Sequence, residues 1–297
     1  MRLAVFGLGF LCVLVLAGGF QSLALQAPQD DEVRGAFLTT RPKTAEKSSA
    51  TAKPSRRRPR TTTPKPIATP TPIPDGGKTP DYEGRVSAQR LGLGFTLFMR
   101  DSNGLAVRVD PSHEFQKGDR VRVLLETNAD GYLYIFNTTD AGSPVMIYPN
   151  PQLDEAGNFL KSHVPFEIPA STEAEERLRW FTFDQYAGTE RLYFVLTREP
   201  LATVPIEDDL IKYCAADKAK CVWQPTPELW ASLQKEMAAP QKVNSARKFG
   251  AAQSEAEHNG AARGIGLAQT DPEPTLVVMT ASSNPVILVT GLELFHK

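Results

Sequence analysis

The sequence has few of the residues that build metal centres and disulfide frameworks. Its 297 residues include only 3 cysteines, 4 histidines and 3 tryptophans. No cysteine pair has the C-x2-C spacing that structural zinc sites use, and the histidines are scattered along the chain. We therefore expect no metal site and no bound cofactor.

Recognisable catalytic motifs are missing as well. The chain has no G-x-S-x-G nucleophile elbow and no G-x-x-x-x-G-K-[ST] phosphate loop. His113 and Glu114 begin like a zinc-protease helix, but Lys117 stands where the second histidine is required. We expect a non-enzymatic protein without catalytic residues. The alternative is a hydrolase or enzyme accessory whose site the sequence does not reveal.

A strong charge of one sign is also lacking, because two regions of opposite charge cancel. Between Pro28 and Asp81 there are 11 Lys and Arg residues against 6 Asp and Glu, whereas from Tyr82 onward there are 21 against 28. A nucleic-acid-binding domain should carry a basic surface. The acidic body therefore argues against a specific nucleic-acid partner.

An apolar stretch opens the chain. Residues 3–20 contain no charged side chain and follow the single basic residue Arg2. This pattern is typical of a secretory signal, and Ser22 and Ala24 supply a small-x-small cleavage site. We predict that residues 1–24 are removed and that the mature protein is periplasmic or on the cell surface. The alternative is an uncleaved inner-membrane anchor, since residues 3–20 are just long enough to span a bilayer.

Residues 25–81 are predicted to be a disordered linker. Proline, threonine, lysine and arginine dominate this stretch, which has too little apolar surface to offset the entropy of ordering. We expect no regular structure between residues 28 and 80. The basic cluster is either part of a solvated spacer or a contact to anionic lipid or cell-wall polymer, through Arg56, Arg57, Arg58 and Arg60.

The body, residues 82–297, is predicted to be an all-β fold. Asn103-Gly104 lies between two apolar runs, which is a strong hairpin signal. Many short segments of this kind at regular spacing favour a β-sandwich of about 8–10 short strands. The predicted strands are 95–99, 105–109, 121–125, 132–136, 145–148, 164–168, 180–183, 191–196, 276–280 and 286–294.

Residues 201–273 interrupt this pattern with a helical and loop insertion. Thr226 and Pro227 form an N-cap and first-turn pair, and apolar residues then recur at helical spacing up to Met237. A second short helix is predicted over 205–213, and a mobile loop over 242–274. The last two strands should then return to the sheet.

If Cys12 leaves with the signal, Cys214 and Cys221 remain. An even number of cysteines in an exported protein predicts a disulfide. Lys218 and Lys220 would lower a thiol pKa, so a redox pair is the alternative. Because redox pairs usually have two intervening residues and this pair has six, we favour a structural bond.

Residues from about 91 to 200 resemble the bacterial domain of unknown function 4384. The shared features are Gly118-Asp119 before a strand, Gly131-Tyr132-Leu133-Tyr134, Tyr148-Pro149-Asn150 and Gly188-Thr189-Glu190. The resemblance implies an exported or surface-associated accessory domain without a family-wide activity or known site residues. We therefore expect a binding domain of the bacterial cell envelope whose partner is an unidentified protein or envelope polymer. Membrane contact is expected only through an uncleaved signal or the basic tail.

Overall fold

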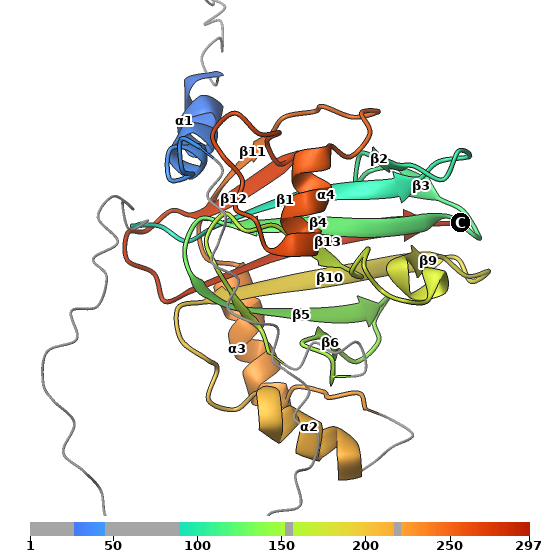
Figure 1. The fold of residues 1–297 in the computed structure, drawn as a ribbon. Coiled ribbons are helices and arrows are strands. Elements are labelled where there is room, and N and C mark those ends of the chain that lie inside the picture. The colour runs from blue at the N-terminus through green and yellow to red at the C-terminus, as the bar shows by residue number, and fades with distance from the viewer. Residues whose placement is uncertain (1–26, 45–88, 152–156, 217–220) are drawn as a thin grey trace, which may run out of the picture.

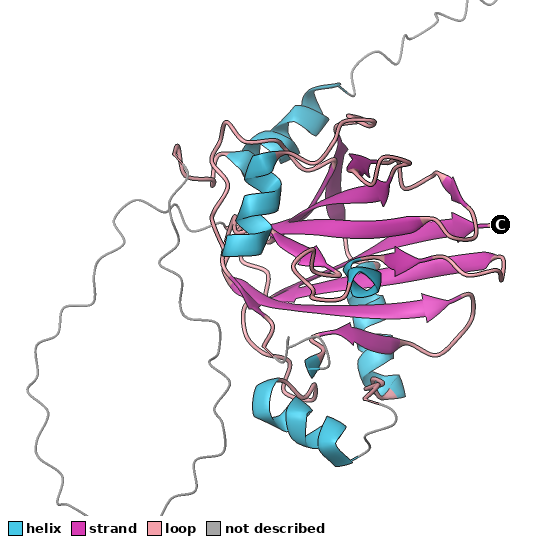
Figure 2. Ribbon diagram, turned by 45° about the vertical axis from the view of Figure 1, so that its right-hand side comes forward, coloured by secondary structure: helices cyan, strands magenta, loops and turns pink. Residues whose placement is uncertain are grey.

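Two β-sheets dominate the computed structural model, which describes residues 27–44, 89–151, 157–216 and 221–297. The described chain is mostly β, with thirteen strands and four α-helices (Figures 1 and 2). All ten predicted strands are present. The three strands that were not predicted are β3 (Glu114–Phe115), β7 (Phe159–Leu160) and β11 (Gln241–Ser245).

The seven-stranded sheet is antiparallel, and its main strand order is β11-β12-β1-β4-β8. The short strands β2 and β9 pair with β1 and β4, respectively. Arg100 pairs with Ala106 across the Asn103-Gly104 turn, so the predicted hairpin is confirmed. The remaining strands of this sheet are β1 (Gly92–Arg100), β2 (Ala106–Arg108), β4 (Arg120–Thr127), β8 (Phe166–Ile168), β9 (Phe181–Thr182) and β12 (Leu276–Thr280).

The six-stranded sheet has the main order β3-β13-β10-β5-β6, and β7 pairs with β5. Its pairs are antiparallel except for β13 with β3. The last two strands of the chain both return as predicted, but to different sheets, β12 to the first and β13 to the second. The remaining strands of this sheet are β5 (Gly131–Thr139), β6 (Val145–Tyr148), β10 (Gly188–Thr197) and β13 (Ile287–His296).

One apolar core joins the two sheets. Side chains alternate across a strand, so every second residue of β1, β4, β5, β10 and β13 reaches this core. Phe95 of β1 stacks on Phe194 of β10 with ring centroids 5.6 Å apart. Burial of each such side chain contributes about 1.5–3 kcal/mol, which makes this core the main source of cohesion between the sheets.

A second core forms on the outer face of the six-stranded sheet. The helices α2 (Glu207–Ala216) and α3 (Pro227–Met237) place Leu210 and Leu233 against Tyr134 and Phe136 of β5. Thr226 accepts a hydrogen bond from the Leu229 backbone at 3.3 Å, so the predicted N-cap is confirmed. Both faces of β5 are apolar because both are covered.

The prediction of a mobile loop over 242–274 is wrong. This segment contains part of β11, which pairs with β12, and the helix α4 (Glu255–Arg263). Ser254 and Glu257 form a capping box at the start of α4. Glu257 also binds Arg108 of β2 at 2.5 Å in a buried ion pair. The segment is ordered because strand pairing and a buried charge pair hold it to the sheet.

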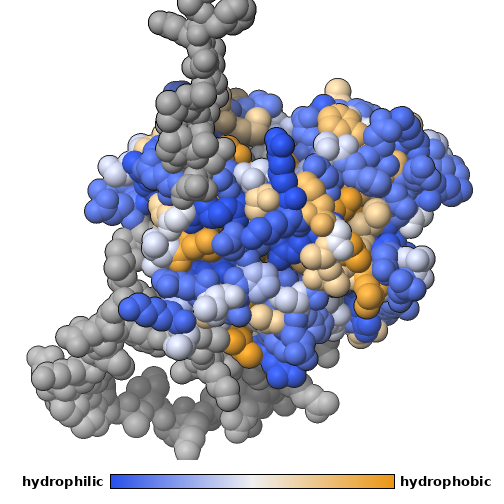
Figure 3. Space-filling model, turned by 90° about the horizontal axis from the view of Figure 1, so that it is seen from above, coloured by the Kyte–Doolittle hydropathy of each residue, from blue (hydrophilic) through white to orange (hydrophobic). Residues whose placement is uncertain are grey.

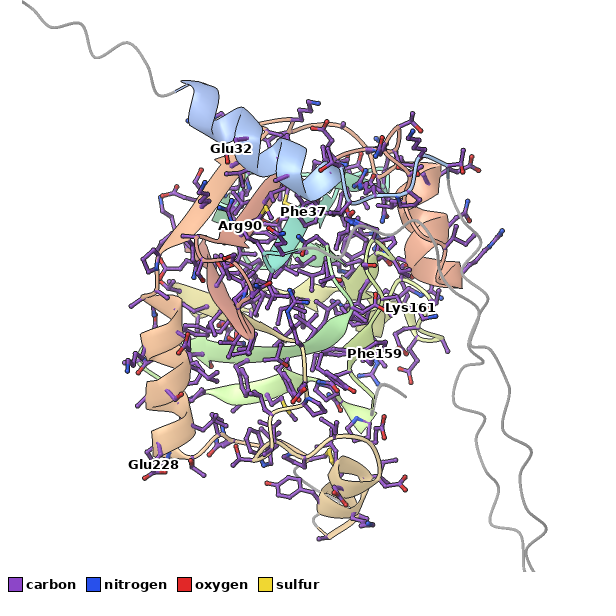
Figure 4. All side chains as sticks on the ribbon, turned by 90° about the vertical axis from the view of Figure 1, so that its left-hand side faces the viewer. Glu32, Phe37, Arg90, Phe159, Lys161 and Glu228 are labelled. Carbon is purple, nitrogen blue, oxygen red and sulfur yellow. A yellow bond between two sulfur atoms is a disulfide. The ribbon has the colours of Figure 1, made fainter. Side chains whose placement is uncertain are left out.

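The prediction of no regular structure between residues 28 and 80 is also wrong at its start. Helix α1 (Ala27–Leu38) packs on β12, with Val33 and Phe37 buried against it. Figure 4 shows Phe37 on the side of α1 that faces the sheet. A Cβ atom added at Gly92 would lie 2.9 Å from the Phe37 ring, so the glycine makes room for it. Val33 and Phe37 are four residues apart and therefore share one helix face.

Arg41 fastens the end of this N-terminal segment, residues 27–44, to the body. Its guanidinium donates to both carboxylate oxygens of Glu126, at 2.7 and 2.6 Å, and to three backbone carbonyls. The ring of His163 lies 2.7 Å from the same carboxylate. Burial alone would raise the pKa of Glu126, but the hydrogen bonds with His163 and Arg41 together hold that pKa below its ordinary value. All three side chains are buried.

Docking of the N-terminal segment changes how the linker is attached. The chain leaves the body after this segment and re-enters it at residue 89, so residues 45–88 join two points of the same body. Residues 25–81 are therefore not one continuous spacer. The basic cluster of Arg56, Arg57, Arg58 and Arg60 and the predicted signal both lie outside the described residues.

Candidate functional site

A pocket of about 260 Å³ opens between the two sheets and is called here the His296 pocket. It lies near the end of the molecule where β9 and the C-terminus are found, on the right in Figure 1. Six strands and the turn after β9 supply its walls. The lining residues are Val121, Asn137, Thr139, Ile147, Phe181, Thr182, Phe183, Asp184, Glu190, Leu192, Leu294 and His296.

The strand register brings the polar residues of this pocket together. Glu190 of β10 pairs with Thr139 of β5 on one side and with Leu294 of β13 on the other. Asn137 and His296 lie two residues from Thr139 and Leu294, on the same faces of their strands. Because β10 runs antiparallel to both neighbours, the start of β10 and the ends of β5 and β13 meet at one cavity.

Glu190 organises one wall of the pocket. Its carboxylate accepts hydrogen bonds from Asn137 Nδ2 at 3.1 Å and from the Thr139 hydroxyl at 2.9 Å. These bonds orient the Asn137 amide, whose Oδ1 is buried and has no hydrogen-bond partner within the described chain. The Asn137 carbonyl oxygen is thus buried within the wall, beside a negative charge.

His296 is the least satisfied polar group of the pocket. Its side chain is only 4% exposed, yet neither ring nitrogen has a hydrogen-bond partner among the described residues. The nearest charged atom is Asp184 Oδ1, 3.6 Å from Nε2, and the Phe183 ring packs beside the imidazole. Leaving a buried polar group unpaired costs about 1–3 kcal/mol, and a buried group without a partner in a native fold calls for an explanation.

The two cysteines that were predicted to pair form a disulfide. The bond joins the last turn of α2 to the segment before α3, and neither cysteine lines the His296 pocket. Lys218 and Lys220 lie outside the described residues. The bond therefore staples the helical insertion at a position apart from the pocket.

Replacing both Cys214 and Cys221 with serine is expected to lower the unfolding midpoint modestly, with a chain-entropy contribution of about 2–3 kcal/mol for so short a loop. Thermal unfolding of the double variant measures the effect. Alkylation of free thiols in the unreduced wild-type protein would contradict the structural role.

The described part of the chain contains neither a membrane-spanning helix nor a metal centre. None of its helices has the length and apolar character needed to cross a bilayer. No group of three or more His, Cys, Asp or Glu side chains in the same ranges is placed to hold a metal ion.

The fold and the pocket define a class: a mostly β domain whose two packed sheets enclose a small, partly polar cavity. Residues 114–200 of this chain match the family model described as Domain of unknown function (DUF4384), which confirms the resemblance over β3 to β10. Ten of the twelve pocket-lining residues fall inside this match. No curated protein and no solved structure matches the chain.

The fold gives physical reasons for the glycines in two motifs of the resemblance. A Cβ atom at Gly131 would lie 2.4 Å from the backbone oxygen of Thr197, so only glycine fits there. Gly118 has a φ of 90°, a backbone conformation that side chains other than glycine rarely adopt. Its N–H donates to the Phe183 carbonyl at 2.9 Å, which ties the turn before β4 to a wall of the pocket.

None of the pocket residues was predicted to be functional from sequence. One signal was present, because the Gly188-Thr189-Glu190 motif of the resemblance carries the carboxylate that organises the wall. His296 gave no signal, since it lies outside the family match.

Proposed function

We propose that this chain is a non-enzymatic, exported binding domain of the bacterial cell envelope, and that its β-sandwich body contacts a protein or envelope polymer through the His296 pocket. One observation carries the proposal. A nearly fully buried imidazole without hydrogen-bond partners lines a cavity large enough for a side-chain-sized group. Apolar pockets with a few convergent polar groups are the usual form of ligand sites.

One further observation supports a role in the cell envelope. The apolar start of the sequence favours export, which places the domain among envelope components. Hydrophilic residues predominate on the face seen in Figure 3, and its apolar residues gather mainly right of centre.

The alternative is a hydrolase, and the approach of Asp184 to His296 is the observation that favours it. A carboxylate beside an imidazole is the arrangement of a general base. A triad-type nucleophile would need a hydroxyl bonded to that imidazole. No described hydroxyl hydrogen-bonds to His296, and Thr139 donates its own hydroxyl hydrogen to Glu190. Binding therefore suits the geometry better than nucleophilic catalysis.

Photo-crosslinking in intact cells tests the proposed function. A photoreactive residue at Tyr186, which is 70% exposed two residues after Asp184, should capture one discrete species. The same residue at Val243, which is 50% exposed on the edge strand β11, serves as the control and should not. Thr182→Trp, which fills the pocket mouth from an exposed position, should abolish capture. Equal capture from both positions, or capture that survives Thr182→Trp, would overturn the proposal.

A further inference from the structure

The polar groups of the His296 pocket are mainly acceptors. Asn137 Oδ1 is buried without a partner, and the Glu190 and Asp184 carboxylates can only accept hydrogen bonds when ionised. A ligand that satisfies these groups must itself carry several N–H or O–H donors.

The charge of the pocket has one sign. Its lining contains the two carboxylates of Asp184 and Glu190, whereas no described lysine or arginine lines it. Positive charge is held nearby but directed elsewhere, because Arg191 binds Glu293 at 2.8 Å and the Asp140 carbonyl. A carboxylate or phosphate in this cavity would meet uncompensated like charge, whereas a cation would be stabilised.

The remaining surface of the pocket is apolar. Its walls are formed by Val121, Ile147, Phe181, Phe183, Leu192 and Leu294. Such walls fit an aliphatic stem better than a hydrated inorganic ion. The cavity, at about 260 Å³, is large enough to hold one long side chain.

We propose that the His296 pocket binds an alkylammonium group, a primary ammonium carried on an aliphatic stem. This inference rests on the proposed binding function and specifies its chemistry. The ammonium lies beside the carboxylates of Asp184 and Glu190, which line the pocket. The stem lies between the aromatic and aliphatic walls.

Three probes of matched length test this chemistry on the full chain: n-pentylammonium, 1-pentanol and pentanoate. Imidazole resonances report binding, and the His296 signal is identified by its loss in His296→Gln. At pH 8, where free histidine is neutral, pentylammonium should shift the His296 signal saturably in the millimolar range. It should bind up to about fivefold more tightly than pentanol, since a partly exposed ion pair contributes up to about 1 kcal/mol. Pentanoate should not bind.

Charge removal provides the matched control. Asp184→Asn should reduce the preference for pentylammonium over pentanol, because it removes one of the two carboxylates of the pocket. The Asp184 side chain is largely exposed, so the substitution should leave the core undisturbed. Glu228→Gln removes the same charge from the exposed start of α3, and should leave the preference unchanged.

Each contrary outcome has a distinct meaning. Equal binding of pentanol, or tighter binding of pentanoate, would overturn the alkylammonium assignment and leave the binding function standing. The same holds if no probe shifts His296 while the Tyr186 crosslinker still captures its species. Failure of both the probes and the capture would overturn the proposed function itself.

Discussion

Replacing Arg41 with alanine is expected to lower the free energy of unfolding by about 3–5 kcal/mol, because the change leaves the buried Glu126 carboxylate without its bidentate partner. A typical domain is stable by only about 5–15 kcal/mol, so this is a large fraction of the total. Urea denaturation of the full chain measures the loss. Arg177→Ala, at an exposed arginine paired with Glu175, is the matched control and should change stability by less than about 0.5 kcal/mol.

Release of the N-terminal segment is a separate consequence of the same change. Glu32 lies 3.6 Å from Lys242 of β11, so a zero-length carbodiimide crosslink between them reports docking of α1. The ion pair of Lys297 and Glu114, at 2.6 Å, lies away from α1 and serves as an internal standard. Arg41→Ala should reduce the first crosslink and leave the second. If the Glu32 crosslink stays at the wild-type level, Arg41 is not what holds the segment.

The sheets could be predicted from the sequence because their signals are local. The alternation of Val121, Val123 and Leu125 predicts β4, and the Asn103-Gly104 turn predicts the hairpin of β1 and β2. The strands β3 and β7 contain only two residues each, too few to show a period. They exist because of their partners, β13 and β5, and their existence therefore depends on the tertiary fold.

The N-terminal segment was missed because its decisive partners are distant. Composition made residues 25–81 look uniformly polar, but Val33 and Phe37 already share a helix face. The burial of Arg41 depends on Glu126, which lies 85 residues further along the chain. A buried arginine cannot be recognised from its own neighbourhood in sequence when its compensating charge is that far away.

The pocket could not be assembled from sequence for a related reason. Its polar residues come from different strands, and each is ordinary in its own segment. What distinguishes His296 is that its ring nitrogens lack partners, and this is a property of the packed fold. The Gly188-Thr189-Glu190 motif belongs to the family resemblance, but it does not indicate which residues Glu190 contacts in the fold.

The ordered segment after β11 leads to the last prediction. Its one strong sequence signal, the capping box of Ser254 and Glu257, was overlooked among alanines and glycines. Glu257 is almost fully buried, and it faces Arg108 as well as capping α4. Burial lowers the pKa of Arg108, and the charge of Glu257 opposes that shift. The Glu257 carboxylate therefore offsets part of the free energy needed to bury the charged guanidinium of Arg108.

Glu257→Ala is accordingly expected to destabilise the protein by about 3–5 kcal/mol and to release α4 from the sheet. Glu257→Gln retains a capping side chain but removes the charge. Its loss of stability should therefore be smaller than that of Glu257→Ala by about 1 kcal/mol, the usual contribution of a cap. Glu255→Ala, at an exposed position of the same first turn, should cost less than about 1 kcal/mol. Urea denaturation measures all three, and limited trypsin digestion should cut at Arg247, Lys248 and Arg263 in Glu257→Ala only. Equal protection of the alanine variant and the wild type would show that strand pairing of β11 alone orders the segment.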